Sequence, residues 1–376
     1  MWLVIISLSG MVGCDFKLPP PPPDVFYKFN TIQVGLGPAY LVSADLNLDD
    51  RLDIIVVNSK DNTLTLLFGE GDGTFQPPVI VPVPLEPSAL AVADINRDGW
   101  PDFVLNSRGT HALVTLLGKG HKAFFPPRSY PTGQVPLLPI LGDFNGDGHL
   151  DIAITLTFNK MEIFLGRGDG TFKNGDTYQT GSRSFSGVAS DFNGDGHTDI
   201  VLAVHSSNAS SIRIFAGRGD GTFLLINKIG QGLNALAIIK KDMNGDGRED
   251  LVAAAGSGDN LYMFPSNGDG TFQKEINFSG GGGPISLVAE DFDGDGQPDV
   301  AVVNSRSSTF SLIVRHPNGG FRFPIRDYVT GGTPLSITSG DYNGDGRVDV
   351  AVASNSLGTV EIFLARSTRH KPKESP

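Results

Sequence analysis

The sequence predicts an all-β protein, a seven-bladed β-propeller with four-stranded blades. The first observation is a nine-residue acidic string that fits the pattern D-x-[ND]-x-D-x-x-x-D and recurs seven times, at intervals of 48 to 51 residues. A regular period of this length accommodates four short strands per repeat. The second observation is composition: 48 Gly and 25 Pro among 376 residues favour many tight turns, and 39% hydrophobic residues supply a sizeable core.

The N-terminal residues 1–14 have the pattern of a signal peptide. An apolar run, too short to span a bilayer, ends at Cys14, the only cysteine of the chain. Residues 11–14, Met-Val-Gly-Cys, resemble the lipobox of bacterial lipoproteins, in which the cysteine is lipidated after cleavage. This resemblance implies an exported, membrane-anchored lipoprotein. No Lys or Arg precedes the apolar run, which indicates a weak signal or a misplaced start codon; if Cys14 is incidental, we expect an extracellular or periplasmic protein.

Residues 15–24 are expected to form a proline-rich tether. Five consecutive prolines at 19–23 favour a stiff, extended chain that would hold the next domain off a membrane surface. Because Cys14 is the only cysteine, no intramolecular disulfide can form and thiolate-ligated structural zinc is excluded. The fold therefore needs another stabilising device.

Residues 25–366 are assigned to the propeller, and we expect its N-terminal strand to close the ring. Residues 25–34 have the aromatic and β-branched content of an outer strand, whereas the seventh repeat ends after 360–364 without a fourth strand. Pairing of these two segments would remove the exposed edges of an open propeller. Residues 367–376 are charged, contain proline and are expected to be a disordered tail.

The sixth repeat illustrates the four strands expected within a blade. Residues 286–289 form a short inner strand before the acidic string, and 300–303 form an apolar strand after it. Residues 310–314 supply the third strand and 321–328 the outer fourth. Each blade should therefore present its acidic string as the loop between its first and second strands.

A glycine-rich turn with the sequence Gly-Asp-Gly-Thr-Phe is expected between the third and fourth strands. Glycine permits the positive φ angles that such hairpins need. The motif decays in the second and sixth repeats but still ends in Phe. The intact copies are residues 71–75, 168–172, 219–223 and 268–272, and the decayed copies are 120–124 and 318–321.

The acidic strings, called here the first to seventh acidic loops, predict calcium sites. Calcium takes six to eight oxygen ligands, and alternate side chains on a tight loop can direct several carboxylates to one point. The backbone carbonyl at position seven and water would complete the shell. Up to seven structural Ca²⁺ ions are expected. The predicted side-chain ligands at positions one, three, five and nine are Asp45, Asn47, Asp49, Asp53, Asp94, Asn96, Asp98, Asp102, Asp143, Asn145, Asp147, Asp151, Asp191, Asn193, Asp195, Asp199, Asp242, Asn244, Asp246, Asp250, Asp291, Asp293, Asp295, Asp299, Asp341, Asn343, Asp345 and Asp349.

The two alternatives to calcium sites are an EF-hand and ordinary turns. An EF-hand opens similarly but needs a Glu at position twelve, where every copy has an apolar residue. Asp, Asn and Gly also build ordinary turns, but a turn does not require three carboxylates, whose mutual repulsion is costly without a cation. The first loop is the weakest candidate, because Asp50 replaces the usual glycine at position six.

The acidic loop followed by the G-D-G-T-F turn resembles the FG-GAP, or VCBS, repeats of bacterial surface proteins and of the integrin α-subunit propeller. The resemblance covers residues 25–366. It implies a seven-bladed propeller with calcium in the loop between the first and second strands of a blade. Such repeats occur in adhesion receptors, lectins and non-catalytic parts of large enzymes, so the resemblance implies a scaffold without fixing its ligand.

The function expected from the sequence is non-catalytic binding of a protein or a glycan at the cell surface, by a monomer. A formal net charge of −12 argues against nucleic acid and against electrostatic docking on a membrane, which leaves a lipid anchor as the only membrane contact. No local catalytic motif is present, so no enzyme activity is expected. The alternatives are a lectin, for which Trp100 is a candidate contact, and a polysaccharide lyase or hydrolase with residues converging across blades.

The tripeptide Arg-Gly-Asp, which integrins recognise, occurs at residues 167–169 and 218–220. Both copies lie inside the repeat's own glycine-rich turn, where other blades carry Glu or Asn in place of Arg. The arginine is therefore one variable choice before the turn, and an adhesive role is not expected.

Overall fold

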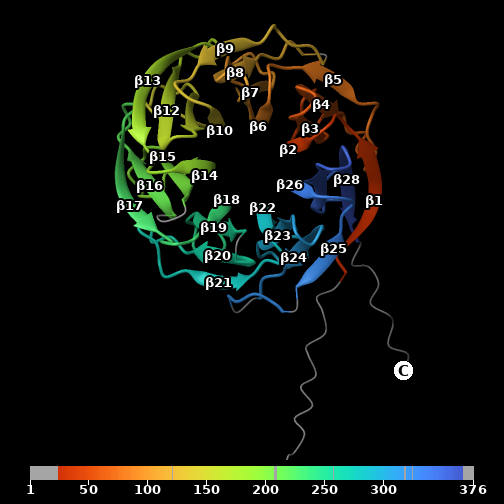
Figure 1. The fold of residues 1–376 in the computed structure, drawn as a ribbon. Coiled ribbons are helices and arrows are strands. Elements are labelled where there is room, and N and C mark those ends of the chain that lie inside the picture. Colours follow the sequence, from red (N-terminus) through yellow and green to blue (C-terminus); the bar gives the residue numbers. More distant parts are fainter. Residues whose placement is uncertain are drawn as a thin grey trace, which may run out of the picture.

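The computed structural model describes residues 24–120, 122–206, 210–256, 258–316, 319–323 and 325–366, and these form a ring of seven antiparallel sheets around a central channel (Figure 1). Every sheet has four strands, and the described residues contain no helix. It follows that no apolar helix in this part of the chain could cross a membrane. The predicted all-β, seven-bladed propeller is confirmed.

The first four blades follow one another along the chain. Blade one contains β2 (Pro38–Ala44), β3 (Asp53–Asn58), β4 (Thr63–Leu67) and β5 (Val79–Pro82). Blade two contains β6 (Pro87–Ala93), β7 (Asp102–Ser107), β8 (Ala112–Leu116) and β9 (Arg128–Pro131). Blade three contains β10 (Pro136–Gly142), β11 (Asp151–Leu156), β12 (Lys160–Gly166) and β13 (Phe172–Gln179). Blade four contains β14 (Arg183–Ser190), β15 (Asp199–His205), β16 (Ser211–Gly217) and β17 (Phe223–Ile229).

The last three blades repeat the arrangement, and the seventh borrows a strand. Blade five contains β18 (Ala235–Lys241), β19 (Asp250–Ala255), β20 (Asn260–Phe264) and β21 (Ile276–Ser279). Blade six contains β22 (Pro284–Glu290), β23 (Asp299–Asn304), β24 (Thr309–Ile313) and β25 (Arg326–Val329). Blade seven contains β26 (Pro334–Gly340), β27 (Asp349–Ser354), β28 (Thr359–Ala365) and, as its outer strand, β1 (Phe26–Gln33).

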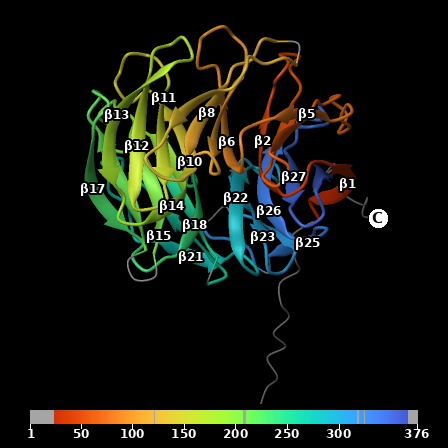
Figure 2. The same ribbon diagram turned by 45° about the horizontal axis from the view of Figure 1, so that its top comes forward.

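Ring closure by the N-terminal strand is confirmed. Strand β1 pairs antiparallel with β28, from Phe26 opposite Ala365 to Gln33 opposite Thr359. In Figures 1 and 2, β1 lies on the rim beside the C-terminal strands. The backbone N–H groups of Val25 and Phe26 also donate to the Tyr328 hydroxyl, at 3.0 and 3.2 Å, which ties β1 to blade six.

The core lies between neighbouring blades. The second strand of every blade is buried along its length, except at His205, which ends β15 and is partly buried. The outer strands β1 and β13 are by contrast largely exposed beyond their first residue. One core cluster, for example, joins Phe192 and Ile212 of blade four to Leu251 and Phe264 of blade five. Each blade therefore buries its apolar side chains against the next, so an incomplete ring would expose two such faces.

The strands of blade six differ in extent from the sequence prediction. The inner three contain the predicted 286–289, 300–303 and most of 310–314, but the outer strand β25 begins only at Arg326. Phe321 instead forms an isolated bridge with Arg315. The predicted signal peptide with Cys14, nearly all of the tether and the C-terminal tail lie outside the described residues.

The topology separates the connections onto two faces of the ring. Because neighbouring strands in a blade are antiparallel, the acidic loops between first and second strands share one face with the turns between third and fourth strands. The turns between second and third strands and the connectors between blades lie on the opposite face. We call these the loop face and the connector face.

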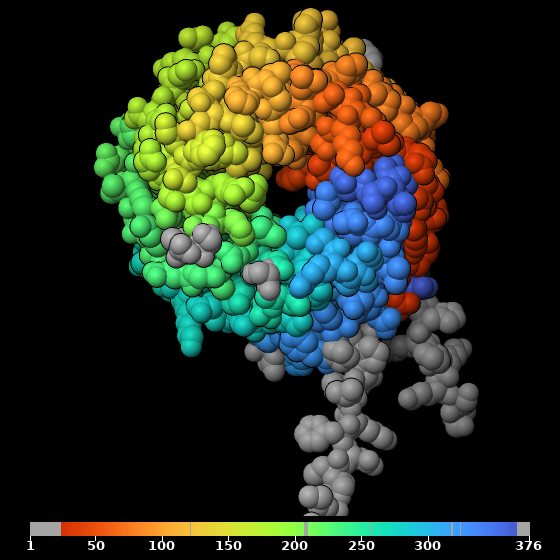
Figure 3. Space-filling view, in the orientation of Figure 1, coloured from red at the N-terminus to blue at the C-terminus, as the bar shows by residue number. Residues whose placement is uncertain are grey.

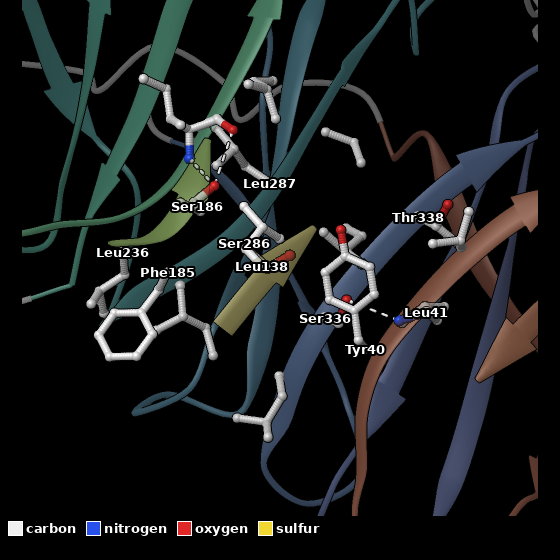
Figure 4. A pocket seen from close by; sticks show the side chains of 18 of the residues that line it. Tyr40, Leu41, Leu138, Phe185, Ser186, Leu236, Ser286, Leu287, Ser336 and Thr338 are labelled. Carbon is white, nitrogen blue, oxygen red and sulfur yellow. Dashed lines mark hydrogen bonds between the residues drawn. The ribbon is translucent and has the colours of Figure 1, made fainter. Parts of the chain in front are cut away.

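The inner strands leave an axial cavity of about 450 Å³, and the ring is visibly hollow at its centre (Figure 3). Its lining is apolar with scattered hydroxyls, and Figure 4 shows Tyr40, Leu138 and Phe185 around it. Two of these hydroxyls join the inner strands of neighbouring blades. Ser336 Oγ accepts a hydrogen bond from Leu41 N–H at 3.3 Å, and Ser186 Oγ accepts one from Ile238 N–H at 2.9 Å.

Candidate metal centres

The first aspartate of each acidic loop shapes the loop through its own carboxylate. In the third loop, Asp143 accepts from Gly146 N–H through Oδ1 and from Gly148 N–H through Oδ2, both at 2.8 Å. Gly146 and Gly148 have φ angles of 71° and 78°, in the left-handed region that favours glycine. In the first loop Asp50 adopts the same conformation, with a φ of 63°, as expected for a residue that tolerates it.

Positions three and five are locked to each other. Asn145 Nδ2 donates to Asp147 Oδ2 at 2.9 Å, and Asp147 N–H donates back to Asn145 Oδ1 at 2.9 Å. His149 N–H in turn donates to Asp147 Oδ1 at 2.8 Å. Short-range hydrogen bonds therefore fix the predicted ligands of this loop relative to one another, which lowers the ordering cost of coordination.

The ninth aspartate is fully buried in every blade, and in the third blade it joins the start of its own acidic loop to the end of the third strand. Asp151 accepts from Phe144 N–H through Oδ2 at 2.9 Å and from Gly166 N–H, at the end of the third strand, through Oδ1 at 2.7 Å. The sequence pattern predicted this residue only as a ligand. The second hydrogen bond spans fifteen residues, so the spacing of the repeat did not reveal it. The seven aspartates are Asp53, Asp102, Asp151, Asp199, Asp250, Asp299 and Asp349.

Burial without a cation disfavours ionisation of these ninth aspartates. It raises the pKa of Asp53 and Asp102 to about 6, and that of Asp299 and Asp349 to about 7. The hydrogen bonds from backbone N–H groups act in the opposite direction, and the other loop carboxylates add repulsion. A cation among the carboxylates would relieve both penalties.

The sixth loop has a geometry that fits a calcium ion. Oxygen atoms of Asp291, Asp293 and Asp299 all lie within 4.8 Å of one another. Calcium binds oxygen at about 2.3–2.6 Å, so three oxygens this close can share one ion. This loop differs from the other six in carrying Asp293 where they carry Asn, which adds a fourth carboxylate. The guanidinium of Arg322 lies nearby, 3.8 Å from Asp293 and 3.9 Å from Asp295.

The glycine-rich turns of blades one, four and five pack on the preceding blade in the ring, a contact that reasoning from a single repeat does not predict. The ring of Phe223 in blade four lies 5.3 Å from Phe144 in the third acidic loop and 5.6 Å from Tyr178 in β13. The turn's second glycine, Gly221, donates its N–H to Phe144 O at 2.9 Å. Equivalent bonds join Gly73 to Tyr342 O and Gly270 to Phe192 O. The turns thus cover the acidic loops from the neighbouring blade.

Trp100 and the aspartates of the two Arg-Gly-Asp tripeptides have partners within the propeller. The indole of Trp100 packs beneath Gly120, whose added Cβ would lie 2.6 Å from the ring. Asp169 and Asp220 of the two Arg-Gly-Asp copies each accept from the N–H and hydroxyl of the threonine two residues later. Asp72 and Asp269 accept the same hydrogen bonds in turns that have no arginine before the glycine. The aspartate therefore serves the turn, whichever residue precedes the glycine.

The comparisons with solved structures show the fold. The propeller of BBS1N, in a crystallised complex with ARL6DN, aligns with a TM-score of 0.65 at 10% identity, over 92% of this chain and 98% of that one. A lectin of Agrocybe aegerita that recognises non-reducing terminal N-acetylglucosamine aligns with a TM-score of 0.55 at 18% identity, over 86% and 95%. A protein of unknown function from Desulfotomaculum acetoxidans aligns with a TM-score of 0.54 at 14% identity, over 81% and 90%.

The family comparison rests on the repeats themselves. A sequence search of curated proteins finds no match. The model of the FG-GAP-like repeat matches six segments, most of which overlap the next: residues 45–105, 94–154, 143–202, 191–239, 242–302 and 291–352. Each segment begins at the first aspartate of an acidic loop and most extend into the second strand of the following blade. The chain belongs to the FG-GAP-like repeat family.

Proposed function

We propose that this protein is an exported, calcium-binding propeller scaffold that binds a protein or a glycan without catalysing a reaction. The observation that carries the proposal is that the residues of the two faces are engaged differently. The acidic loops of the loop face are engaged with their own backbone and with neighbouring turns, whereas the connector face presents short, variable turns around a rigid ring. We further propose that it acts as a monomer, held at a membrane only by the lipid on Cys14.

Calcium has a structural role in this proposal. Seven Ca²⁺ ions, which carry fourteen positive charges, would change the formal net charge from −12 to +2. The sixth loop already brings three carboxylates within range of one ion. Calcium would hold the first two strands of each blade together at the loop face, and the ring would then keep the connectors of the opposite face in fixed positions.

The connector face offers features that suit a ligand. Four large apolar side chains on its turns and connectors are exposed, with Phe158 at 73%: Leu36, Leu85, Phe158 and Leu357. A cleft of about 460 Å³ between blades one and two is lined by Leu85 together with Lys60, Glu86 and Arg108. Among the described residues, none of these three charged side chains forms an ion pair. Apolar contacts beside unpaired polar groups are typical of sites that recognise proteins and sugars.

The comparisons support a binding role of this general kind. One structural neighbour is a lectin for N-acetylglucosamine, and another was crystallised with a protein partner. No carboxylate, histidine or lysine is among the described residues that line the axial cavity, so nothing there favours the hydrolase alternative.

A glycan array distinguishes the two ligand classes. The protein lacking its predicted leader, residues 1–14, would be applied in calcium and again after chelation. Hits on related glycans that depend on calcium, and that weaken in Lys60→Glu and Arg108→Glu variants, would establish the lectin assignment. Folded, calcium-loaded protein that binds no glycan would direct the search to a protein partner. Binding that survives both charge reversals unchanged would contradict the assignment to this cleft.

A further inference from the structure

The axial cavity has one phenylalanine at its connector-face end. The first strand of every blade begins at the connector face and has a register shift near its start. In blade four the residue at this shift is Phe185, which lines the cavity and is 41% exposed (Figure 4). The other blades have small or aliphatic residues there, so only blade four places an aromatic ring at this position. The corresponding residues are Ala39, Ser88, Leu137, Leu236, Ile285 and Leu335.

The guanidinium of Arg183 and the imidazole of His205 lie beside the Phe185 ring. Arg183 Cζ is 5.9 Å from the centroid of that ring, and the centroid of the His205 ring is 6.3 Å from it. Arg183 and His205 stand opposite each other, at the connector-face ends of β14 and β15. Both line a second cavity of about 320 Å³, whose lining also includes Ser182 and Asn234. The apolar axial cavity and this polar cavity therefore adjoin at Phe185.

The arginine at this place has no acidic partner. Among the described residues, no carboxylate forms an ion pair with Arg183, and His205 Nδ1 is buried without a hydrogen-bond partner. In five other blades a backbone hydrogen bond joins the two corresponding positions, and only blade two has a cation there, with an acidic residue at the other position. Blade four therefore differs from these five in presenting positive charge without a negative counterpart. The five pairs are Gly37 and Ser59, Glu86 and Arg108, Val135 and Thr157, Gly283 and Ser305, and Thr333 and Asn355.

We propose that the axial cavity binds an amphipathic monocarboxylate, with its apolar tail among the inner strands and its carboxylate held by Arg183 and His205. The lining of the cavity is largely apolar, and its volume of about 450 Å³ lies within the range of about 300–1,000 Å³ that is typical of small-molecule sites. A guanidinium can bind a carboxylate through two parallel hydrogen bonds, and an imidazole N–H can donate a third. The adjoining apolar and cationic parts select a ligand that has both a tail and an anionic group.

This ligand goes beyond the protein or glycan of the proposed function, and its binding does not depend on the cleft between blades one and two. Isothermal titration of the full chain with sodium hexanoate, octanoate and decanoate tests the inference. We expect one molecule to bind per chain, and the affinity to rise about fourfold with each methylene, because a longer tail buries more apolar surface. Octan-1-ol, which has a tail of similar length and no charge, should bind roughly tenfold or more weakly than octanoate.

Two variants separate the two parts of the site. Arg183 is exposed, so Arg183→Gln should fold normally; it should weaken octanoate binding by about tenfold or more and leave octan-1-ol binding unchanged. Ser286→Phe should weaken the binding of both compounds, because it places a ring inside the cavity. Blade one already has Tyr40 at the corresponding position of its first strand, so the fold accommodates an aromatic residue there.

Arg306 provides the matched control on the connector face. It pairs with Asp259, so Arg306→Gln makes the same change in net charge as Arg183→Gln and should bind octanoate as the wild type does. The inference would be overturned if folded wild-type protein bound neither octanoate nor decanoate, or if the affinity did not depend on chain length. Unchanged octanoate binding in Arg183→Gln or in folded Ser286→Phe would also overturn it, as would an equal loss in Arg306→Gln. If Ser286→Phe does not fold, the dependence on chain length decides whether the tail is buried.

Discussion

At the scale of single residues, the seven ninth aspartates are distinguished from the other predicted ligands by burial. The carboxylate of Asp151 accepts two backbone N–H groups, whereas Asp147 is an exposed residue that lies in the loop itself. Removing Asp151 therefore leaves two buried donors without an acceptor, but removing Asp147 does not.

The pair of variants Asp151→Ala and Asp147→Ala separates structural from metal-binding roles. In chelator, Asp151→Ala should lower the free energy of unfolding by about 2–6 kcal/mol, because it leaves two buried donors unsatisfied and each costs about 1–3 kcal/mol. Asp147→Ala should cost less than about 1 kcal/mol in chelator and more in calcium, where a ligand is lost. Denaturant unfolding in both buffers measures these differences. Equal costs for both variants in chelator would contradict the structural role of Asp151.

The raised pKa values of the buried aspartates predict an unusual pH dependence for the calcium-free protein. The pKa values of about 6 for Asp53 and about 7 for Asp349 lie above those of the unfolded chain, so the folded state binds more protons between about pH 4 and pH 7. Stability of the metal-free protein should therefore fall as pH rises through this window. Calcium favours the ionised carboxylates, so the increase in melting temperature that it causes should be larger at pH 8 than at pH 5. An increment independent of pH would contradict the account.

At the scale of elements, strand β1 is the clearest case of a segment whose role follows from its place in the ring. It supplies the outer strand of the seventh blade and reaches blade six through the Tyr328 hydroxyl. Lys28 also pairs with the buried Glu361 at a distance of 2.7 Å. Without β1, strand β28 would be an exposed edge, and the apolar side chains of Val25 and Phe26 would leave the core cluster that they share with Phe310.

Truncation tests this role. A chain that begins at Gly37 should melt at a lower temperature than the full chain, with lower cooperativity and more aggregation, because the last blade has lost its outer strand. Removal of residues 367–376 serves as the control and should leave the melting curve unchanged. If a chain starting at Gly37 melted at as high a temperature and as sharply as the full chain, pairing of β1 with β28 would contribute nothing to the stability of the ring.

The elements also show what could be predicted from the sequence and what could not. The repeat spacing placed the acidic loops and the inner three strands of blade six, because both follow local patterns of turn residues and apolar alternation. It extended the fourth strand back to Phe321, because a bridging aromatic residue after a turn resembles the start of a strand. The contact between Phe223 and the preceding blade joins two repeats in space, and no pattern within one repeat contains it.

The same limit applies to the candidate metal centres. The ligand types were predicted from their spacing, since alternate positions on one tight loop converge. The burial of Asp299 depends on tertiary packing.

At the scale of the whole molecule, the ring combines a charged face with a rigid frame. Its apolar clusters lie between blades, so the seven sheets stabilise one another, and the acidic loops concentrate like charges on one face. Those charges oppose folding unless cations bind, because net repulsion on a compact surface is unfavourable. Calcium should therefore act on the stability of the complete ring rather than on one blade.

The most direct test of the calcium-binding scaffold is the melting temperature of the chelated protein, before and after stoichiometric calcium is restored, with bound metal counted in parallel. The account predicts that several calcium ions bind per chain, that chelation lowers the melting temperature by more than about 10 °C, and that calcium restores it. A melting temperature that is the same with and without chelator, in a protein that retains no calcium, would contradict it.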